Sequence, residues 1–420
     1  MPDRRGATVL DDLPAEITVD KILALLPPKD VGRCRAVRRS WRSATSTPEF
    51  TLEHHRLQPS LPIIDGRPSR FVVFHDSGDG SSSDQQLWPF PLTPKLDDRV
   101  CLHASTDGLL VVSEGCRFHI CNPATRRRAP LPQHPNSLPR YGILGLYRHD
   151  GTGEHRVLWS SCVKLLSCRN EPVKREITLH VLTVGDDESR AIRVTLPTPC
   201  LEQALLEGLP RNNHYSEVHP PIRHRHNLHW MRRYCAAGTG EIIVFDTKAE
   251  SFRWMHLPIQ PGHFDKLFDM EGNLALCSVD RRGTAMGVWV MQDYEAEIWA
   301  FKFRIDVSVI EASRSLDLTS DLRKEKGKIK KHPLDSTTVE YITTMTMLDE
   351  RELLVQFNAK HALHCDIDGK FLRMAKIGKR QCRMELTPHR LQESIIPIPG
   401  GEMEKEDDPA PWEYAWMFSS

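Results

Sequence analysis

The chain has 420 residues, and its 56 lysines and arginines balance its 56 aspartates and glutamates, so the formal net charge is zero. This balance excludes the overall basicity that would attract nucleic acid or an anionic membrane surface. No apolar run approaches the about 18 residues of a membrane span, and the N-terminus lacks the apolar core of a signal peptide. We therefore expect a soluble protein of the cytoplasm, the nucleus or both, with one large or two unequal domains.

Residues 10–50, which follow an N-terminus (1–9) expected to be disordered, are predicted to form a small helical module. Pro14 suits the first turn of a helix, and the apolar residues after it continue to Leu26, where two prolines stop the helix. Asp30 suits the N-cap of a second helical stretch, whose apolar residues recur at helical spacing: Val31, Cys34, Val37, Trp41 and Ala44. A module this small rarely forms a hydrophobic core large enough for its own stability, so some apolar surface should remain for a partner.

The order of these residues resembles the F-box. The resemblance rests on Leu13, Pro14, Glu16, Ile17, Ile22, Leu23, Leu26, Pro27, Val31, Cys34, Arg35, Val37, Trp41, Pro48 and Phe50. In that family the module docks on the Skp adaptor of a cullin-RING ubiquitin ligase, and the rest of the chain captures the substrate. The resemblance implies an adaptor-binding set, which we expect at Leu13, Pro14, Ile17, Ile22, Leu23, Leu26, Pro27, Val31, Val37 and Trp41. The sequence does not separate core residues of the module from contact residues.

Residues 51–98 are predicted to be a linker with a flexible loop. This stretch is rich in proline, serine, glycine and aspartate, which favour irregular structure. One apolar burst, Phe71 to Phe74, indicates a first strand.

Residues 99–399 repeat a β-rich unit, in which an apolar strand leads to a turn at Asp or Asn and a second strand follows. The copies are Leu109–Pro132, Ile177–Pro197, Ile242–Pro258, Val288–Ile305 and Leu363–Ile377. Separate hairpins would leave exposed sheet edges, so we predict a closed ring, a β-propeller of about five or six blades. A sixth blade would combine the Phe71 burst with a strand at Glu393–Pro399, and residues 400–420 would form a flexible tail.

The repeats resemble the F-box-associated, kelch-like domains of plants, a family that pairs an N-terminal F-box with a propeller. The segments Phe245–Pro258 and Gly287–Trp299 carry this resemblance, because a strand, an Asp turn and a return strand with tryptophan recur in that family. The kelch double glycine is absent, which leaves the blade number open. We expect the aromatic and apolar residues of these strands to be core residues: Phe252, Trp254, Val288, Trp289, Val290, Trp299 and Phe301.

Three charged or serine-rich stretches suggest functions for which we favour a simpler interpretation. The arginines of the helical module could bind nucleic acid, Asp76 to Ser81 has the shape of a phosphodegron, and the lysines between 324 and 331 could form a nuclear address. We interpret the first as a solvated face and the other two as loops. The arginines are Arg33, Arg35, Arg38, Arg39 and Arg42.

Motifs of enzyme active sites are missing: the sequence has no G-x-S-x-G, Walker, G-x-G-x-x-G or H-E-x-x-H motif. The 11 cysteines form no Cys-x-x-Cys pair, so we predict neither disulfides nor zinc. One stretch gathers histidines without a visible acidic or cysteine partner, and we predict a structural role for them: His214, His219, His224, His226 and His229. We therefore name no catalytic residue, metal ligand or cofactor.

The sequence predicts a non-catalytic substrate receptor of an SCF-type (Skp-cullin-F-box) ubiquitin ligase. The implied partners are the Skp adaptor, the cullin and RING subunits bound through it, and a target protein that is ubiquitinated and degraded. Neither nucleic acid nor a membrane is an expected partner. The alternative is a propeller that is itself an enzyme or a small-molecule binder, whose abundance or location the F-box sets. Acids, bases or metal ligands that converge at the central channel would favour the alternative.

Overall fold

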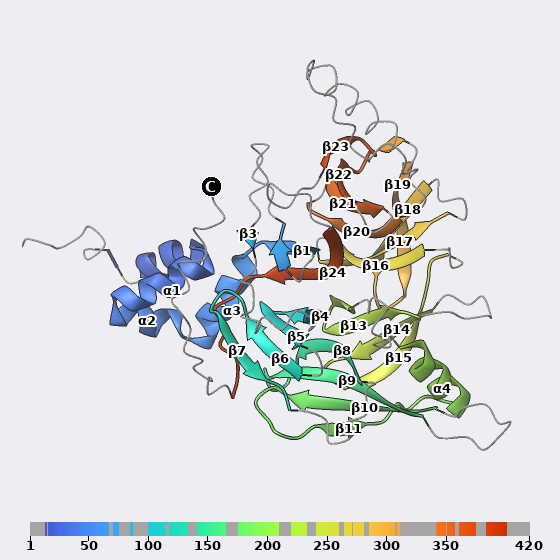
Figure 1. The fold of residues 1–420 in the computed structure, drawn as a ribbon, viewed down its shortest axis with the longest axis horizontal. Helices are drawn as coiled ribbons and strands as arrows, with labels where there is room; N and C mark the ends of the chain where they lie inside the picture. The colour runs from blue at the N-terminus through green and yellow to red at the C-terminus, as the bar shows by residue number, and fades with distance from the viewer. Residues whose placement is uncertain are drawn as a thin grey trace, which may run out of the picture.

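The computed structural model describes residues 13–14, 16–66, 70–74, 85–86, 100–114, 117–132, 141–164, 175–209, 220–232, 241–259, 264–270, 272–280, 285–306, 309–310, 342–349, 351–357, 361–374 and 384–400. In this part of the chain a helical region precedes six four-stranded antiparallel sheets, arranged as the blades of a propeller (Figure 1). The predicted fold class, a small helical module followed by a propeller of about five or six blades, is confirmed. Within the same residues, no helix is both long and apolar enough to cross a membrane.

The helical region contains a π-helix, a 3₁₀ helix and three α-helices: η2 (Ile17–Ile22), η3 (Leu23–Leu25), α1 (Pro28–Val37), α2 (Arg39–Thr45) and α3 (Pro48–Leu57). The second predicted helical stretch is divided, because α1 begins at Pro28 and Arg38 is extended before α2. Asp30 therefore lies in the first turn of α1 and is not its N-cap. The Thr47 hydroxyl caps α3 by accepting the Phe50 N–H at 3.2 Å.

Five blades contain four consecutive strands each, and a closing blade joins the first three strands of the chain to the last. The closing blade contains β24 (Met384–Gln392), β1 (Ser60–Gly66), β2 (Arg70–Val73) and β3 (Gln85–Gln86). Blades 2 and 3 contain β4 (Val100–Thr106), β5 (Leu109–Glu114), β6 (Arg117–Asn122), β7 (Arg127–Pro130), β8 (Tyr141–Arg148), β9 (His155–Lys164), β10 (Arg175–Thr183) and β11 (Arg190–Ile192). Helix α4 (Pro199–Gly208) follows β11.

Blades 4 to 6 continue the same order around the ring. They contain β12 (Ile222–His224), β13 (Asn227–Met231), β14 (Glu241–Asp246), β15 (Ser251–His256), β16 (Phe264–Met270), β17 (Asn273–Val279), β18 (Ala285–Asp293), β19 (Ile298–Asp306), β20 (Ile342–Met347), β21 (Glu352–Phe357), β22 (His361–Asp366) and β23 (Phe371–Met374). First strands of neighbouring blades contact one another, as β4 contacts β8 and β20 contacts β24, so they surround the axis of the ring.

The closing strand differs from the predicted one. β24 pairs with β1 from Ser60 opposite Gln392 to Gly66 opposite Met384, so the N-terminal and C-terminal strands do close the ring together. The predicted strand Glu393–Pro399 lies just beyond β24 and forms no ladder. Its prolines lack the N–H that a ladder needs, and the side-chain amide of Asn122 in blade 2 binds two of its carbonyls instead.

The predicted linker over 51–98 also differs from the structure. Helix α3 fills its start, two residues separate α3 from β1, and the closing blade takes up β1, β2 and β3. Adjacent residues Ile63 and Ile64 of β1 are both fully buried, because each blade is covered by a neighbour on both faces. The predicted disordered N-terminus, the Asp76 to Ser81 tract, the lysine stretch and the tail beyond residue 400 lie outside the described residues.

The apolar core is divided among the gaps between blades. One buried cluster fills each of the six gaps, and each cluster draws side chains from the two blades that face it. The cluster between blades 3 and 4 also takes Leu205 and Leu209 from the α4 region. Each fully buried apolar side chain contributes about 1.5–3 kcal/mol. Blade-to-blade packing therefore holds the ring together.

Two of the predicted Asp turns, in blades 4 and 5, also connect neighbouring blades. Asp246 accepts two backbone N–H groups of its turn at 2.8 and 2.9 Å, and Asp293 accepts two at 3.0 Å. The turns end at Glu250 and Glu297, which have left-handed φ values of 50° and 54°. Each glutamate then pairs with an arginine of the preceding blade: Glu250 with Arg156 at 2.7 Å and Glu297 with Arg253 at 2.9 Å.

The aromatic residues predicted as core divide into three groups. Phe252 is 5% exposed in the core between blades 3 and 4, whereas Phe301 is 56% exposed on β19, the outer strand of blade 5. The core prediction for Phe301 is wrong, because an outer strand has no further strand beside it to cover the side chain. The Phe301 ring contacts Trp289 edge to face. Trp254, Trp289 and Trp299 are half-buried.

We predict that Phe252→Ala lowers the free energy of unfolding by about 3–5 kcal/mol, because the substitution leaves a cavity between two blades. Phe301→Ala should lower it by less than about 1 kcal/mol. Thermal unfolding followed by circular dichroism compares the two variants. Equal losses would contradict the difference in burial.

Candidate docking surface and its attachment to the propeller

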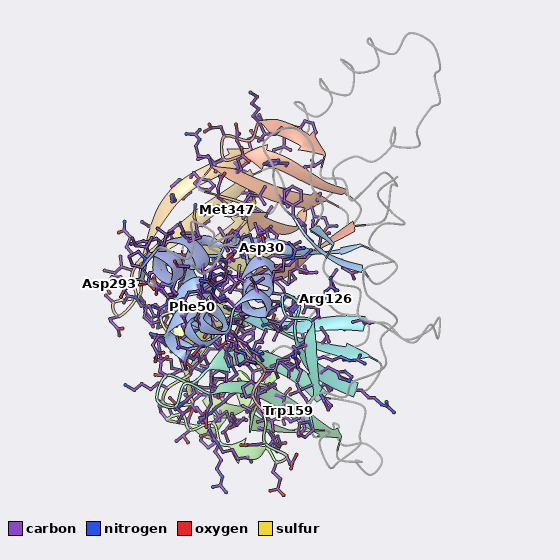
Figure 2. The ribbon with its side chains drawn as sticks, turned by 90° about the vertical axis from the view of Figure 1, so that its left-hand side faces the viewer. Asp30, Phe50, Arg126, Trp159, Asp293 and Met347 are labelled. Carbon is purple, nitrogen blue, oxygen red and sulfur yellow. The ribbon has the colours of Figure 1, made fainter. Side chains whose placement is uncertain are left out.

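The helical module leaves large apolar side chains exposed to solvent. Leu25 is 70% exposed, Val37 77% and Ile17 43%. Leu57, at the end of α3, is 51% exposed. A module of this size does not cover them with its own helices, and exposed apolar side chains gathered on one small module are typical of a docking surface. Figure 2 shows the module in front of the propeller, with Asp30 and Phe50 labelled.

The predicted adaptor-binding residues lie partly in the core of the helical module and partly on its surface. Leu23 and Val31 are 2% and 0% exposed, so they belong to the core of the module. The half-buried members are Leu13, Ile22, Leu26 and Trp41, and the exposed members are Pro14, Ile17, Pro27 and Val37. Leu25 is exposed as well, although the resemblance did not place it in the adaptor-binding set. The change from π-helix to 3₁₀ helix at Leu23 alters the direction of the side chains that follow.

The arginines of the module do not act as one basic patch. Arg35 joins α1 to α2, since its Nε donates to the Thr45 hydroxyl at 2.9 Å, and burial together with the charge of Arg42 lowers its pKa. The Arg38 guanidinium lies 5.0 Å from the Trp41 ring. Arg39 and Arg42 are exposed and follow the exposed Val37 along the chain.

Two buried histidines of α3, which the sequence did not single out, organise the module. His54 is fully buried, and its Nε2 donates to the Leu26 carbonyl at 2.8 Å. This bond satisfies a carbonyl at the end of η3, and the His54 ring stacks on Phe50 with 5.7 Å between ring centroids. Burial is the main cause that lowers the pKa of His54, so the ring is neutral near pH 7.

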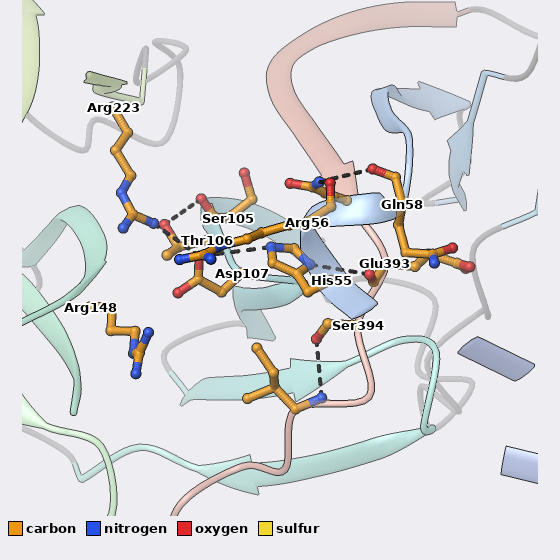
Figure 3. A network of polar contacts seen from close by, with 12 residues as sticks. His55, Arg56, Gln58, Ser105, Thr106, Asp107, Arg148, Arg223, Glu393 and Ser394 are labelled. Carbon is orange, nitrogen blue, oxygen red and sulfur yellow. Dashed lines mark hydrogen bonds and ion pairs between the residues drawn. The ribbon is translucent and has the colours of Figure 1, made fainter. Parts of the chain in front are cut away.

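His55 attaches α3 to the propeller (Figure 3). It is 6% exposed, and its Nδ1 donates to the Glu393 carbonyl at 3.2 Å. Its Nε2 lies 3.8 Å from the Asp107 carboxylate, in the turn between β4 and β5. Burial is the main cause that lowers the pKa of His55, although the Asp107 charge and the Glu393 carbonyl act in the opposite direction.

Asp107 connects three parts of the structure at one end of the central strands. Its carboxylate accepts hydrogen bonds from Arg223 of β12 at 2.9 Å and His155 of β9 at 3.2 Å, and it faces His55 of α3. Burial alone would raise the pKa of the Asp107 carboxyl, but these partners lower it well below its usual range. The carboxylate is therefore charged near neutral pH.

The chain beyond β24 crosses this turn and packs against it. A Cβ at Gly108 would lie 2.5 Å from the Ser394 hydroxyl, so no larger residue fits at that position. Asn122 donates to the carbonyls of Ser394 and Ile396 at 3.1 and 2.8 Å. These contacts hold residues 393–396 between α3 and blade 2.

The described members of the predicted histidine stretch lie in the structure of blade 4. His229 is fully buried, donates from Nδ1 to the Ile222 carbonyl at 3.0 Å and lies 2.8 Å from the Tyr294 hydroxyl. Burial lowers its pKa to about 3. Across the described residues, no group of three or more His, Cys, Asp or Glu side chains is placed to hold a metal. His214 and His219 lie outside the described residues.

The family match and the related sequences agree with the architecture. Residues 68–329 match the family described as "F-box associated beta propeller domain". The chain is 24% identical over 300 residues to F-box protein At5g18160 of Arabidopsis thaliana, which covers 70% of each chain. It is 22% identical over 424 residues to F-box protein At1g30790 of the same plant, which covers 91% of this chain and 98% of the relative. Among solved structures, YCF48 from Cyanidioschyzon merolae aligns with a TM-score of 0.37 and 12% identity, over 79% of this chain and 96% of that one.

We predict that acid destabilises the helical module through His54. Its pKa in the fold lies below the unfolded value of about 6.5, so the unfolded chain binds more protons below that pH. The stability contributed by neutral His54 is complete above about pH 6.5 and is lost as the pH falls towards the pKa of the folded state. Urea unfolding followed by far-ultraviolet circular dichroism at several pH values should show a smaller slope for His54→Gln. An unchanged slope in this variant would mean that another group causes the acid sensitivity.

Proposed function

Because the chain belongs to the family of F-box associated beta propeller domains, we propose that it is the substrate-recognition subunit of an SCF-type ubiquitin ligase. The helical module docks on the Skp adaptor and, through it, on the cullin and RING subunits, while the propeller binds the protein to be degraded. The observation that carries this proposal is the exposed apolar surface of a helical module joined directly to the propeller. The similarity to Arabidopsis F-box proteins supports the same assignment.

The exposed apolar surface is large enough to hold an adaptor. Burying Ile17, Leu25 and Val37 would supply about 1.5–3 kcal/mol each. The half-buried neighbours add further area, and association itself costs at least about 4 kcal/mol. The exposed positive charges of Arg39 and Arg42 on the same module favour an adaptor surface that carries acidic groups.

Catalysis is supplied by the other subunits in this proposal. The chain holds the target close to the conjugating enzyme, and the high local concentration drives the transfer. Recognition of the target belongs to the loops of the propeller, since strands are constrained by packing and ladder hydrogen bonds. We place the protein in the cytoplasm, the nucleus or both, where such a ligase would meet its targets.

The alternative function, an enzymatic or small-molecule-binding propeller, has less support. Convergent acids and bases near the ring axis would favour it. Asp107, at one end of the central strands, is engaged in structural contacts with Arg223 and His155. No observation specifically favours the alternative.

We predict that Leu25→Asp combined with Val37→Asp abolishes co-purification with a Skp adaptor, because a desolvated carboxylate cannot replace an apolar contact. The matched control is Leu201→Asp, an exposed leucine in the first turn of α4 on the propeller, where a carboxylate is compatible with the helix. Circular dichroism verifies that both variants fold. Retained adaptor binding by a folded double variant would contradict the proposed docking surface.

A further inference from the structure

The connection between the helical module and the propeller is too short to act as a flexible tether. Gln58 and Pro59 alone separate α3 from β1. The side-chain amide of Gln392, the last residue of β24, donates to the Gln58 carbonyl at 2.8 Å and to the Arg56 carbonyl at 3.4 Å. The end of α3 is therefore bonded to both strands of the closing pair. At this connection, the helical module could still rotate relative to the propeller.

His55 is placed to prevent this rotation. It points from α3 into the space between the β4–β5 turn and the chain after β24, as Figure 3 shows. Asp107 in that turn is held by His155 of blade 3 and Arg223 of blade 4. The contact therefore joins the module to blades 2, 3 and 4, in addition to its bonds to the closing blade.

We infer that His55 is the positioning residue of the helical module, which fixes one orientation of the module on the propeller by its contacts with Glu393 and the Asp107 turn. The use of a fixed orientation rests on the proposed function. A receptor that holds its target near a conjugating enzyme is most effective when its adaptor-binding module and its target-binding propeller keep a fixed relative orientation. The orientation itself can be measured without any target.

The charges that face His55 come from every element around it. They are Asp107 of the β4–β5 turn, His155 of β9, Arg223 of β12, His54 of α3 and Glu393 after β24, with Lys29 of α1 acting on Glu393. Arg148 also lies near this network (Figure 3). The docked ring is neutral near pH 7, so acidification below about pH 6.5 favours the undocked module, where His55 takes up a proton freely. Asp107 opposes this release, because its negative charge favours the protonated ring.

Glu393 is a second titratable group beside this contact. Burial raises the pKa of its carboxyl, although the charge of Lys29 acts in the opposite direction. A variant that lacks the titrating ring separates the two contributions. His55→Asn is suited to this purpose, because its amide places a donor near the position of Nδ1 and carries no titrating group.

The test measures the distance between one spin label on α2 and one on the propeller in the full chain. Labels at Ser43 and Ala296, both exposed, are introduced through non-natural amino acids, and pulsed electron resonance gives the distance distribution. At about pH 7.5 the unaltered chain and His55→Asn should give one narrow distribution, whereas His55→Ala should give a broad or split one. Arg56→Ala, which alters the adjacent exposed residue of α3, is the matched control and should leave the distribution narrow.

The pH profile distinguishes positioning from a general loss of stability. On acidification to about pH 5.5, the unaltered chain should shift towards the broad distribution, and His55→Asn should shift less. Asp107→Asn should shift at a higher pH than the unaltered chain, because the charge that favours the docked, protonated ring is gone. Asparagine also tolerates the left-handed φ of 52° at this position.

The outcomes separate this inference from the proposed function. A narrow distribution in folded His55→Ala would overturn the inference, whatever the adaptor does. If Asp107→Asn loses its near-ultraviolet circular dichroism, the His55 variants decide the result. Failure of the unaltered chain to bind a Skp adaptor would contradict the proposed function and leave the distance measurement valid.

Discussion

The antiparallel pairing of β1 with β24 is the interaction on which the rest of the structure depends. It joins residues from opposite ends of the chain, Ser60 to Gln392, and so closes the ring. Arg390 of β24 strengthens the joint, because its guanidinium donates to the Ser60 hydroxyl and to the Thr346 hydroxyl of blade 6, each at 3.1 Å. Since α3 ends just before β1, the same pairing also determines where the helical module lies.

Because of this arrangement, the position of the docking surface depends on closure of the ring. The surface proposed for the adaptor belongs to helices that are stable only with their own core, Leu23 and Val31, and with the His54 bond to Leu26. The position of that surface relative to the blades depends on His55 and on residues 393–396. A substrate receptor needs both properties, a surface for the ligase and a set geometry between the ligase and the target.

The sequence was sufficient to predict the architecture and part of the candidate docking surface. Prolines and a periodic apolar pattern located the first helices, and repeated Asp turns such as the one at Asp246 indicated a propeller. The sequence could not show that Leu25 is exposed, because that depends on a change of helix type. It could not identify Asp107 either, since its partners His155 and Arg223 lie 48 and 116 residues away, and a hairpin turn with Asp-Gly is common. Contacts of this kind are set by the closed ring.

The contacts of α3 with the closing blade couple this helix to the propeller. Native-state hydrogen exchange, measured as a function of denaturant, tests this coupling most directly. Amides of α3 should share their opening free energy with amides of β1 and β24, so that all three segments exchange in one step. Exchange in α3 that is far faster, while β1 and β24 stay protected, would contradict this coupling and show that the module is a separate body.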